Sequence, residues 1–180
     1  MIATGRCLCS LFVLGGLLTA TPAFADTPTP GDIPDSQAFV RSSTGSYSLL
    51  TPEGWARTTT SHGIALADKY NGIGVELTKA PKAPTVRSAA ATDVPRLRSS
   101  VPGFASPRVT TLTRPAGNVV LIRYQGKSRR DPVTGRTVVN DFERYEFWKS
   151  GRLAAVTLQA PHGSDNVDPW KKVTTSFRWR

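Results

Sequence analysis

Asp141, Glu143 and Glu146 form a carboxylate cluster within a segment predicted to be a β-strand. On a strand, Asp141 and Glu143 share one face and lie about 7 Å apart. A pair of carboxylates in one cleft is what a glycosidase uses for acid–base and nucleophilic chemistry. Basic neighbours, Arg123 and Arg144, make cross-strand ion pairs the simpler interpretation.

The two histidines of the chain, His62 and His162, are each followed by glycine in predicted loops. Neither has a second histidine at metal-ligand spacing, so we predict no metal site and no cofactor. The run His162-Gly163-Ser164-Asp165 contains triad residue types, but adjacent residues cannot adopt triad geometry. We therefore predict no catalytic residues. The alternative is a small secreted hydrolase that acts on a cell-wall substrate through Asp141, Glu143 and His62.

A basic loop is the first candidate binding site, because four cations fall close together there: Lys127, Arg129, Arg130 and Arg136. Guanidinium groups suit phosphate or carboxylate partners, so an envelope protein or an anionic wall polymer could dock on this loop. The other interpretation is a solvated hairpin with dispersed charge.

An aromatic group is the second candidate, made of Trp55, Tyr70, Tyr145 and Trp148. Exposed together, these side chains would form a contact surface, since Trp and Tyr anchor interfaces. They could equally be core residues, and core is the favoured interpretation for Trp55 beside its Pro-x-Gly turn.

Residues 1–25 have the order of a secretory signal peptide. Arg6 precedes an apolar block at 11–18, and Ala23-Phe24-Ala25 places small residues at the cleavage positions. We expect cleavage after Ala25 and a secreted, extracytoplasmic protein without a stable membrane span. An uncleaved membrane anchor is the alternative.

The predicted cleavage after Ala25 changes which reactive side chains the mature chain contains. Both cysteines precede the apolar block, so the mature chain of 155 residues has none, which excludes disulfides and thiol nucleophiles. Loss of Arg6 leaves 22 basic and 13 acidic side chains, a net charge of +9. Such a chain favours anionic surroundings, although positive charge also simply aids solubility. No long run of lysine or arginine occurs, so nucleic acid is not an expected partner.

The element pattern predicts a proline-rich flexible linker at 26–43 and one domain at 44–180. Early strands are predicted at 47–50, 64–70 and 73–79. Asn71-Gly72 is expected to form a type I′ hairpin turn between the last two, because both residues tolerate positive φ.

A helix is predicted between Pro84 and Gly103, capped by Thr85. Pro95 should bend it or divide it, with Asp93 capping the second part. A last helix is expected to begin with Asp168 as N-cap before Pro169.

The remaining segments predict strands at 109–113, 119–125, 136–149 and 153–159. The alternation in the third of these changes face, which a β-bulge near Arg144 would reconcile. Helices against a meandering antiparallel sheet make an α+β sandwich.

These segments resemble the PsbP-like superfamily, including exported actinobacterial proteins of the LpqN type. The resemblance rests on Tyr47-x-Leu49-x-x-Pro52-x-Gly54-Trp55, on Gly117-x-x-Val120-x-x-Arg123-Tyr124, on the aromatic strand 142–148 and on Ser176-Phe177-x-Trp179. It implies an α/β/α sandwich with about six to seven antiparallel strands. It also implies a non-catalytic binding or accessory role in the cell envelope.

Overall fold

The fold is seen in a computed structural model that describes Met1 and residues 31–128, 130 and 135–180. Apart from Met1, the predicted signal peptide lies outside these residues. Residues 26–30 of the predicted linker and Arg129 of the predicted basic loop also lie outside them. The strands are β1 (Phe39–Ser43), β2 (Tyr47–Pro52), β3 (Ala56–Thr60), β4 (Gly63–Asp68), β5 (Asn71–Lys79), β6 (Ala105–Arg114), β7 (Gly117–Lys127), β8 (Val139–Lys149), β9 (Arg152–Pro161) and β10 (Arg178–Trp179). The helices are α1 (Val86–Ser88), the π-helical turn η1 (Ala89–Asp93), α2 (Val94–Ser100) and α3 (Val167–Thr175).

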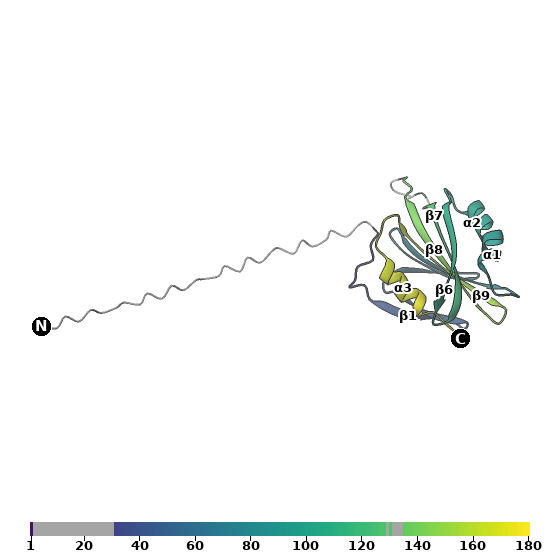
Figure 1. The fold of residues 1–180 in the computed structure, drawn as a ribbon, viewed down its shortest axis with the longest axis horizontal. Coiled ribbons are helices and arrows are strands. Elements are labelled where there is room, and N and C mark those ends of the chain that lie inside the picture. Colours follow the sequence, from purple (N-terminus) through teal and green to yellow (C-terminus); the bar gives the residue numbers. More distant parts are fainter. Residues whose placement is uncertain (2–30, 129, 131–134) are drawn as a thin grey trace.

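The main sheet of the described residues has seven strands in the order β3-β4-β5-β9-β8-β7-β6 (Figure 1). Every neighbouring pair in it is antiparallel. A small sheet, β1-β2-β10, joins the start of the fold to its end. The predicted α+β class with an antiparallel sheet is confirmed.

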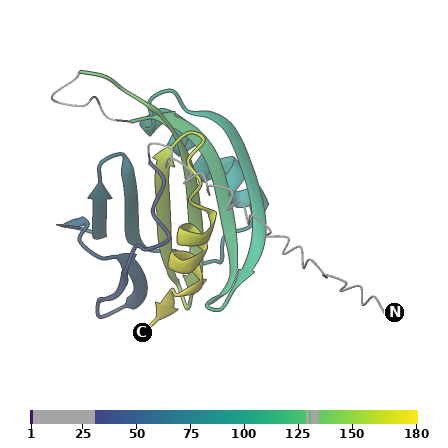
Figure 2. The same cartoon turned by 90° about the vertical axis from the view of Figure 1, so that its left-hand side faces the viewer.

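Both faces of the main sheet are covered (Figure 2). On one face, Val173 and Phe177 from the end of the chain pack with Tyr145 and Phe147 of β8 in the larger core cluster. On the other face, Leu97 of α2 packs with Phe142 and its neighbours in a smaller cluster. The arrangement is therefore an α/β/α sandwich. No helix in the described residues is long and apolar enough to cross a bilayer.

Strand β8 contains no β-bulge near Arg144, contrary to the sequence-based expectation. Its register with β7 and with β9 is continuous over its whole length. Tyr145 and Phe147 face α3, whereas Arg144 and Glu146 are buried on the face that carries α1 and α2. Because both faces of β8 are covered, apolar side chains occur on both of them, and the alternation in the sequence changes face without a bulge.

The hairpin between β4 and β5 also differs from expectation. Lys69 and Tyr70 form the turn, with Lys69 at φ +51°, and Asn71 already pairs with Asp68. Asn71 and Gly72 lie inside β5 instead of forming a type I′ turn. Asn71 is buried there, and its side-chain oxygen accepts a hydrogen bond from Asn166, so its polar group stabilises the tertiary structure.

Thr85 caps the first helix as predicted, in a capping box with Ser88. The π-helical turn η1 lies directly before α2 and lets the helical segment continue through Pro95. Proline has no N–H to donate, and a π-turn is a common way to adjust the hydrogen-bond ladder nearby. The predicted cap by Asp93 is wrong: Asp93 is helical, makes no cap hydrogen bond, and pairs with Arg96.

The ordered fold begins before residue 44. Ile33 is buried, and β1 pairs along its length with β2. The side chain of Asn166 accepts a hydrogen bond from the Ile33 N–H at 2.7 Å and donates one to the Gly31 carbonyl at 2.9 Å. Residues 31–43 are therefore part of the domain and not of a flexible linker. Asn166 is also the N-cap position of α3, in place of the predicted Asp168.

Candidate functional site

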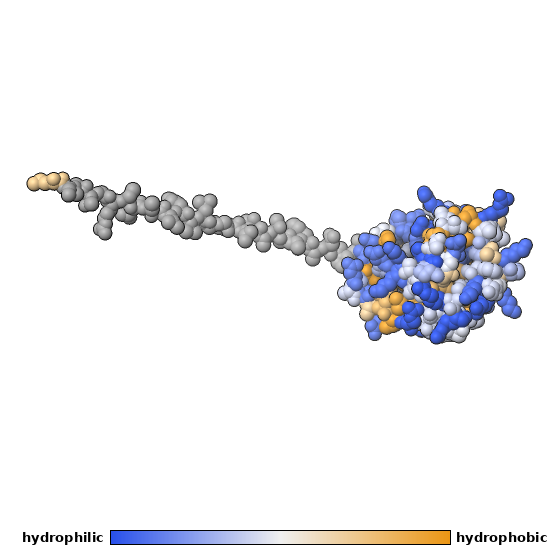
Figure 3. Space-filling view, turned by 60° about the horizontal axis from the view of Figure 1, so that its bottom comes forward, coloured by the Kyte–Doolittle hydropathy of each residue, from blue (hydrophilic) through white to orange (hydrophobic). Residues whose placement is uncertain are grey.

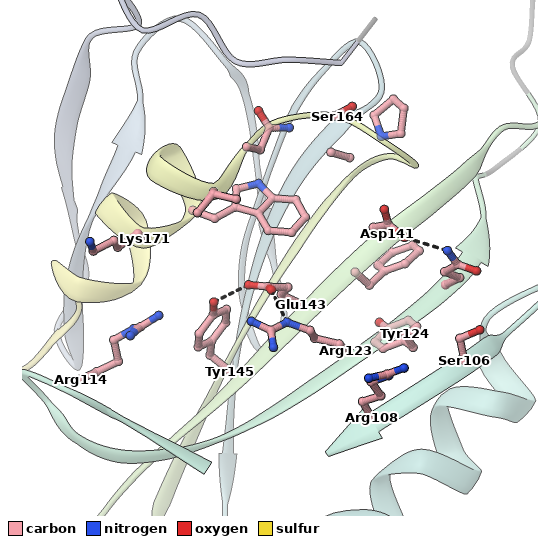
Figure 4. A pocket seen from close by; sticks show the side chains of 17 residues that line it. Ser106, Arg108, Arg114, Arg123, Tyr124, Asp141, Glu143, Tyr145, Ser164 and Lys171 are labelled. Atoms are coloured by element: carbon pink, nitrogen blue, oxygen red, sulfur yellow. Dashed lines mark hydrogen bonds and ion pairs between the residues drawn. The ribbon is translucent and has the colours of Figure 1, made fainter. Parts of the chain in front are cut away.

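A cleft of about 470 Å³ opens between α3 and strands β6, β7 and β8 (Figure 4). Its floor is the part of the main sheet that α3 does not cover. Clefts of this size are typical of sites for small ligands or short polymer segments. We call it the α3 cleft.

Strand alternation directs the polar floor residues into the α3 cleft. Asp141 and Glu143 of β8 point to the same face as Tyr145, which packs beneath α3. The register places Gln125 opposite Asp141 and Arg123 opposite Glu143 on β7. Because paired residues in an antiparallel sheet share a face, four polar side chains meet on the floor.

Helix α3 and strand β6 supply the walls. Trp170 and Lys171 extend from α3, and Arg108 and Arg114 lie near opposite ends of β6. The labelled cations in Figure 4 surround the floor from three elements. Helix α3 is held at this height because Val173 is buried against the sheet.

Glu143 has two side-chain hydrogen-bond partners in the cleft. It accepts a hydrogen bond from Arg123 Nε at 2.5 Å and another from the Tyr145 hydroxyl. Burial, followed by this hydrogen bond, raises the pKa of Tyr145 to about 12. Tyr145 is thus a protonated donor at neutral pH, and Glu143 is held as a structural acceptor.

Asp141 is linked to His162. The His162 Nδ1 atom lies 2.8 Å from Asp141 Oδ2, and Gln125 donates to Asp141 Oδ1 at 3.1 Å. The side chains of His162 and Asp141 are 61% and 40% exposed, so water screens their interaction. The ion-pair interpretation of the carboxylates agrees with these contacts for Glu143. Arg144, by contrast, lies on the other face and pairs with Glu146 and Glu76.

Three cations of the α3 cleft lack a carboxylate partner among the described residues: Arg108, Arg114 and Lys171. The guanidinium of Arg114 lies 5.4 Å from the centre of the Tyr145 ring, and its Nε donates to Thr174 at 3.1 Å. Arg114 is therefore fixed in place while its charge remains uncompensated. With Arg123, the cleft has four cations and two carboxylates, which suits an anionic ligand.

His62 is far from the carboxylates. Its carbonyl accepts from Leu77 of β5, and Leu77 is in register with Ala154 of β9, which pairs with Phe147 of β8. Asp141 lies six residues farther along β8, about 20 Å away at the rise of a strand. The three residues that the hydrolase alternative needs do not meet in one cleft. No group of three potential metal ligands occurs in the described parts of the chain.

The predicted basic loop is only partly brought together. Lys127 and Arg130 line a separate cavity of about 390 Å³, which we call the second pocket, together with Lys69, Tyr70, Asn140 and Gln159 among others. Arg136 is exposed and is not among the residues that line either cavity, and Arg129 lies outside the described residues.

The predicted aromatic group is dispersed. Tyr145 is buried in the α3 cleft and Trp55 packs half-buried against the larger core cluster. Tyr70 is 39% exposed at the second pocket, and Trp148 donates to the Ala80 carbonyl at 2.8 Å. These four residues form no shared contact surface. In the view of Figure 3, apolar patches are small and interspersed with hydrophilic side chains.

The sequence pattern did not indicate Arg108, Arg114, Trp170 or Lys171 as site residues. The signal available was even spacing: Arg108 and Arg114 fall on one face of β6, with Thr110 and Leu112 between them. The contribution of α3 depends on how the helix docks, which no local spacing encodes. The contact between His162 and Asp141 follows from the β8–β9 register, since His162 N–H donates to the Val139 carbonyl.

No family model matches the sequence, and no curated protein matches it. Among solved structures, the cyanobacterial PsbP protein CyanoP from Synechocystis sp. PCC 6803 is similar with a TM-score of 0.56. It is 14% identical, and the match covers 84% of this chain and 98% of that chain. A protein of unknown function from Pseudomonas aeruginosa, PA94, matches at a TM-score of 0.44 and 12% identity, over 77% of this chain and 94% of that chain. The chain thus has a PsbP-like fold.

Proposed function

We propose that this chain is an exported, non-catalytic binding protein of the bacterial cell envelope, which holds an anionic envelope component in the α3 cleft. The observation that carries the proposal is the surplus of positive charge in that cleft. Arg108, Arg114 and Lys171 face it without a carboxylate partner in the described residues. The signal-peptide pattern of residues 1–25 supports export.

The carboxylates of the cleft support binding over catalysis. Glu143 is engaged by Arg123 and Tyr145, and Asp141 by Gln125 and His162. A general acid must present its proton to the substrate, whereas these carboxylates accept hydrogen bonds from the groups around them. The PsbP-like fold is compatible with an accessory role.

The ligand chemistry follows from the donors. Guanidinium groups bind phosphates and carboxylates in a bidentate manner, and the rings of Trp170 and Tyr145 offer flat apolar surfaces beside them. A segment of an anionic wall polymer presents such anions in series and fits an open cleft of this kind. An acidic segment of an envelope protein presents the same anions, so the experiment must separate the two sources.

The test uses retention of the exported protein on isolated envelope fractions at increasing salt. We expect retention that falls with salt, because exposed charges are screened. The double variant Arg108→Gln/Lys171→Gln should lose most of it, while Lys149→Gln, an exposed lysine outside both cavities, should not. Prior protease digestion of the fraction should leave retention intact if the ligand is a polymer. Equal retention of all variants would refute the site.

A separate assay addresses the hydrolase alternative. The exported protein is incubated with purified wall material, and soluble fragments are measured. We expect no turnover. Fragment release that Asp141→Asn abolishes would replace binding by catalysis as the function of the α3 cleft.

A further inference from the structure

The second pocket has its own charge pattern, independent of the α3 cleft. Lys69 from the β4–β5 turn, Lys127 from the end of β7 and Arg130 line it. No aspartate or glutamate is among its described lining residues. Three cations of one sign around a small cavity repel one another unless an anion lies between them.

Asn140 provides a second and unusual feature of the same pocket. Its side chain is completely buried, yet neither its carboxamide oxygen nor its nitrogen has a hydrogen-bond partner among the residues that the structure describes. Burial of an unpaired amide is costly, so such groups in folded proteins generally serve a partner. Asn140 lines the second pocket, where it offers one acceptor and one two-proton donor.

Strand geometry explains why this carboxamide meets the pocket. Asn140 and Phe142 are two residues apart on β8, so both face the side that carries α2. Gly126 pairs opposite Asn140 on β7, and Gln159 pairs opposite Phe142 on β9. With no side chain at Gly126, the end of α2 approaches closely at Val101, and Asn140 and Gln159 remain as the polar groups of the floor.

Two backbone positions with positive φ place the lysines. Lys69 adopts φ +51°, which is uncommon for a residue with a side chain. Gly103 has φ +64°, and a Cβ there would lie only 3.0 Å from Lys127 Cγ, so the lysine stem runs along this turn. Backbone strain of this kind is often found beside binding sites.

We propose that the second pocket binds a small phosphate monoester that carries hydroxyl groups. The phosphate lies among Lys69, Lys127 and Arg130, and the hydroxyls pair with the carboxamides of Asn140 and Gln159. A hydroxyl both donates and accepts, which matches the two unpaired atoms of Asn140. The inference does not rest on the α3 cleft, because the two cavities share neither these cations nor these amides.

The test is a calorimetric titration of the full chain with glycerol 3-phosphate, in parallel with glycerol and with inorganic phosphate. We expect saturable binding of glycerol 3-phosphate, weaker binding of inorganic phosphate, and none of glycerol. Lys69→Gln/Lys127→Gln should weaken binding about tenfold or more, as loss of charged hydrogen bonds does. Lys149→Gln is the matched control and should bind as the native chain does.

Asn140→Leu separates this proposal from simple anion attraction. It should abolish the preference for glycerol 3-phosphate over inorganic phosphate while leaving phosphate binding in place. Gln159→Leu is a second variant on the floor, and it should reduce the same preference. It takes the place of Asn140→Leu in the test if that variant does not fold. Absence of saturable binding, or an unchanged preference in the variants that fold, would overturn the proposal. Failure of Arg108→Gln/Lys171→Gln to alter this titration is expected, and distinguishes it from the α3 cleft.

Discussion

Gly126 is the point at which the end of α2 closes on the sheet, and Gly126→Ala tests that contact quantitatively. A Cβ at this position would lie 2.4 Å from Val101 Cγ1 and 3.2 Å from Phe142 Cε2. The first distance is about 1 Å short of an ordinary contact at 3.4 Å. Val101 is β-branched and has little rotamer freedom, so the end of α2 must move away from β7.

Overpacking of this kind costs about 1–3 kcal/mol of unfolding free energy. The rescue variant is Val101→Ala, which removes the methyl group that collides. In the double variant Gly126→Ala/Val101→Ala the new Cβ fills part of the space left, so the two changes should compensate. Neighbouring substitutions that share a contact typically couple by about 0.5–3 kcal/mol.

The assay is urea unfolding of the four chains of this double-mutant cycle, followed by tryptophan fluorescence. We expect Gly126→Ala alone to be destabilised and the double variant to be more stable than the sum of the single effects. Strict additivity, or a neutral Gly126→Ala, would refute the close approach of α2 to β7.

Three further predictions concern the domain as a whole. Gly63→Ala should be strongly destabilising, because a Cβ there meets a backbone carbonyl oxygen at 1.8 Å. Gly74→Ala should be neutral or slightly stabilising in thermal unfolding, because the nearest atom to a Cβ there is the Thr157 carbonyl oxygen at 4.0 Å, an ordinary contact. Asn166→Ala should lower the free energy of unfolding by about 2–3 kcal/mol, because its buried hydrogen bonds are lost. Faster amide exchange at Ile33 would show that the start of the domain has detached, whereas unchanged exchange would contradict this prediction. Burial, with Asp93 as a smaller contributor, raises the pKa of Glu146, so its contribution to stability is present below pH about 4.5 and is lost as pH rises through the raised value. The advantage of Glu146→Gln in urea unfolding should therefore grow from pH 4 to pH 8, and parallel pH curves would contradict this.

The antiparallel sheet was predictable because its strands carry local signals. Ser150-Gly151, with φ +48° and +80°, forms the turn between β8 and β9, and serine and glycine are typical turn residues. The hairpin turn predicted at Asn71-Gly72 was wrong, because Asn71 lies inside β5 and accepts a tertiary hydrogen bond from Asn166 at 3.4 Å. Long-range partners of this kind leave no trace in short-range spacing.

The candidate sites were only partly predictable for the same reason. Glu143 and Arg123 were linked correctly, since residues paired across two antiparallel strands share a face. Lys171 joins them only because α3 docks over β8, which depends on burial of Val173 and Phe177. The unpaired state of Asn140 depends on contacts from three strands and the end of α2, and its residue type alone is uninformative.

Hydrogen–deuterium exchange of the protein, with and without an isolated anionic envelope fraction, tests the central claim most directly. If the α3 cleft holds the anion, amides of β8 around Asp141 to Tyr145 and of α3 around Lys171 should exchange more slowly in the mixture. This protection should disappear in Arg108→Gln/Lys171→Gln. Protection confined to strands away from α3, or identical protection in that variant, would contradict the account.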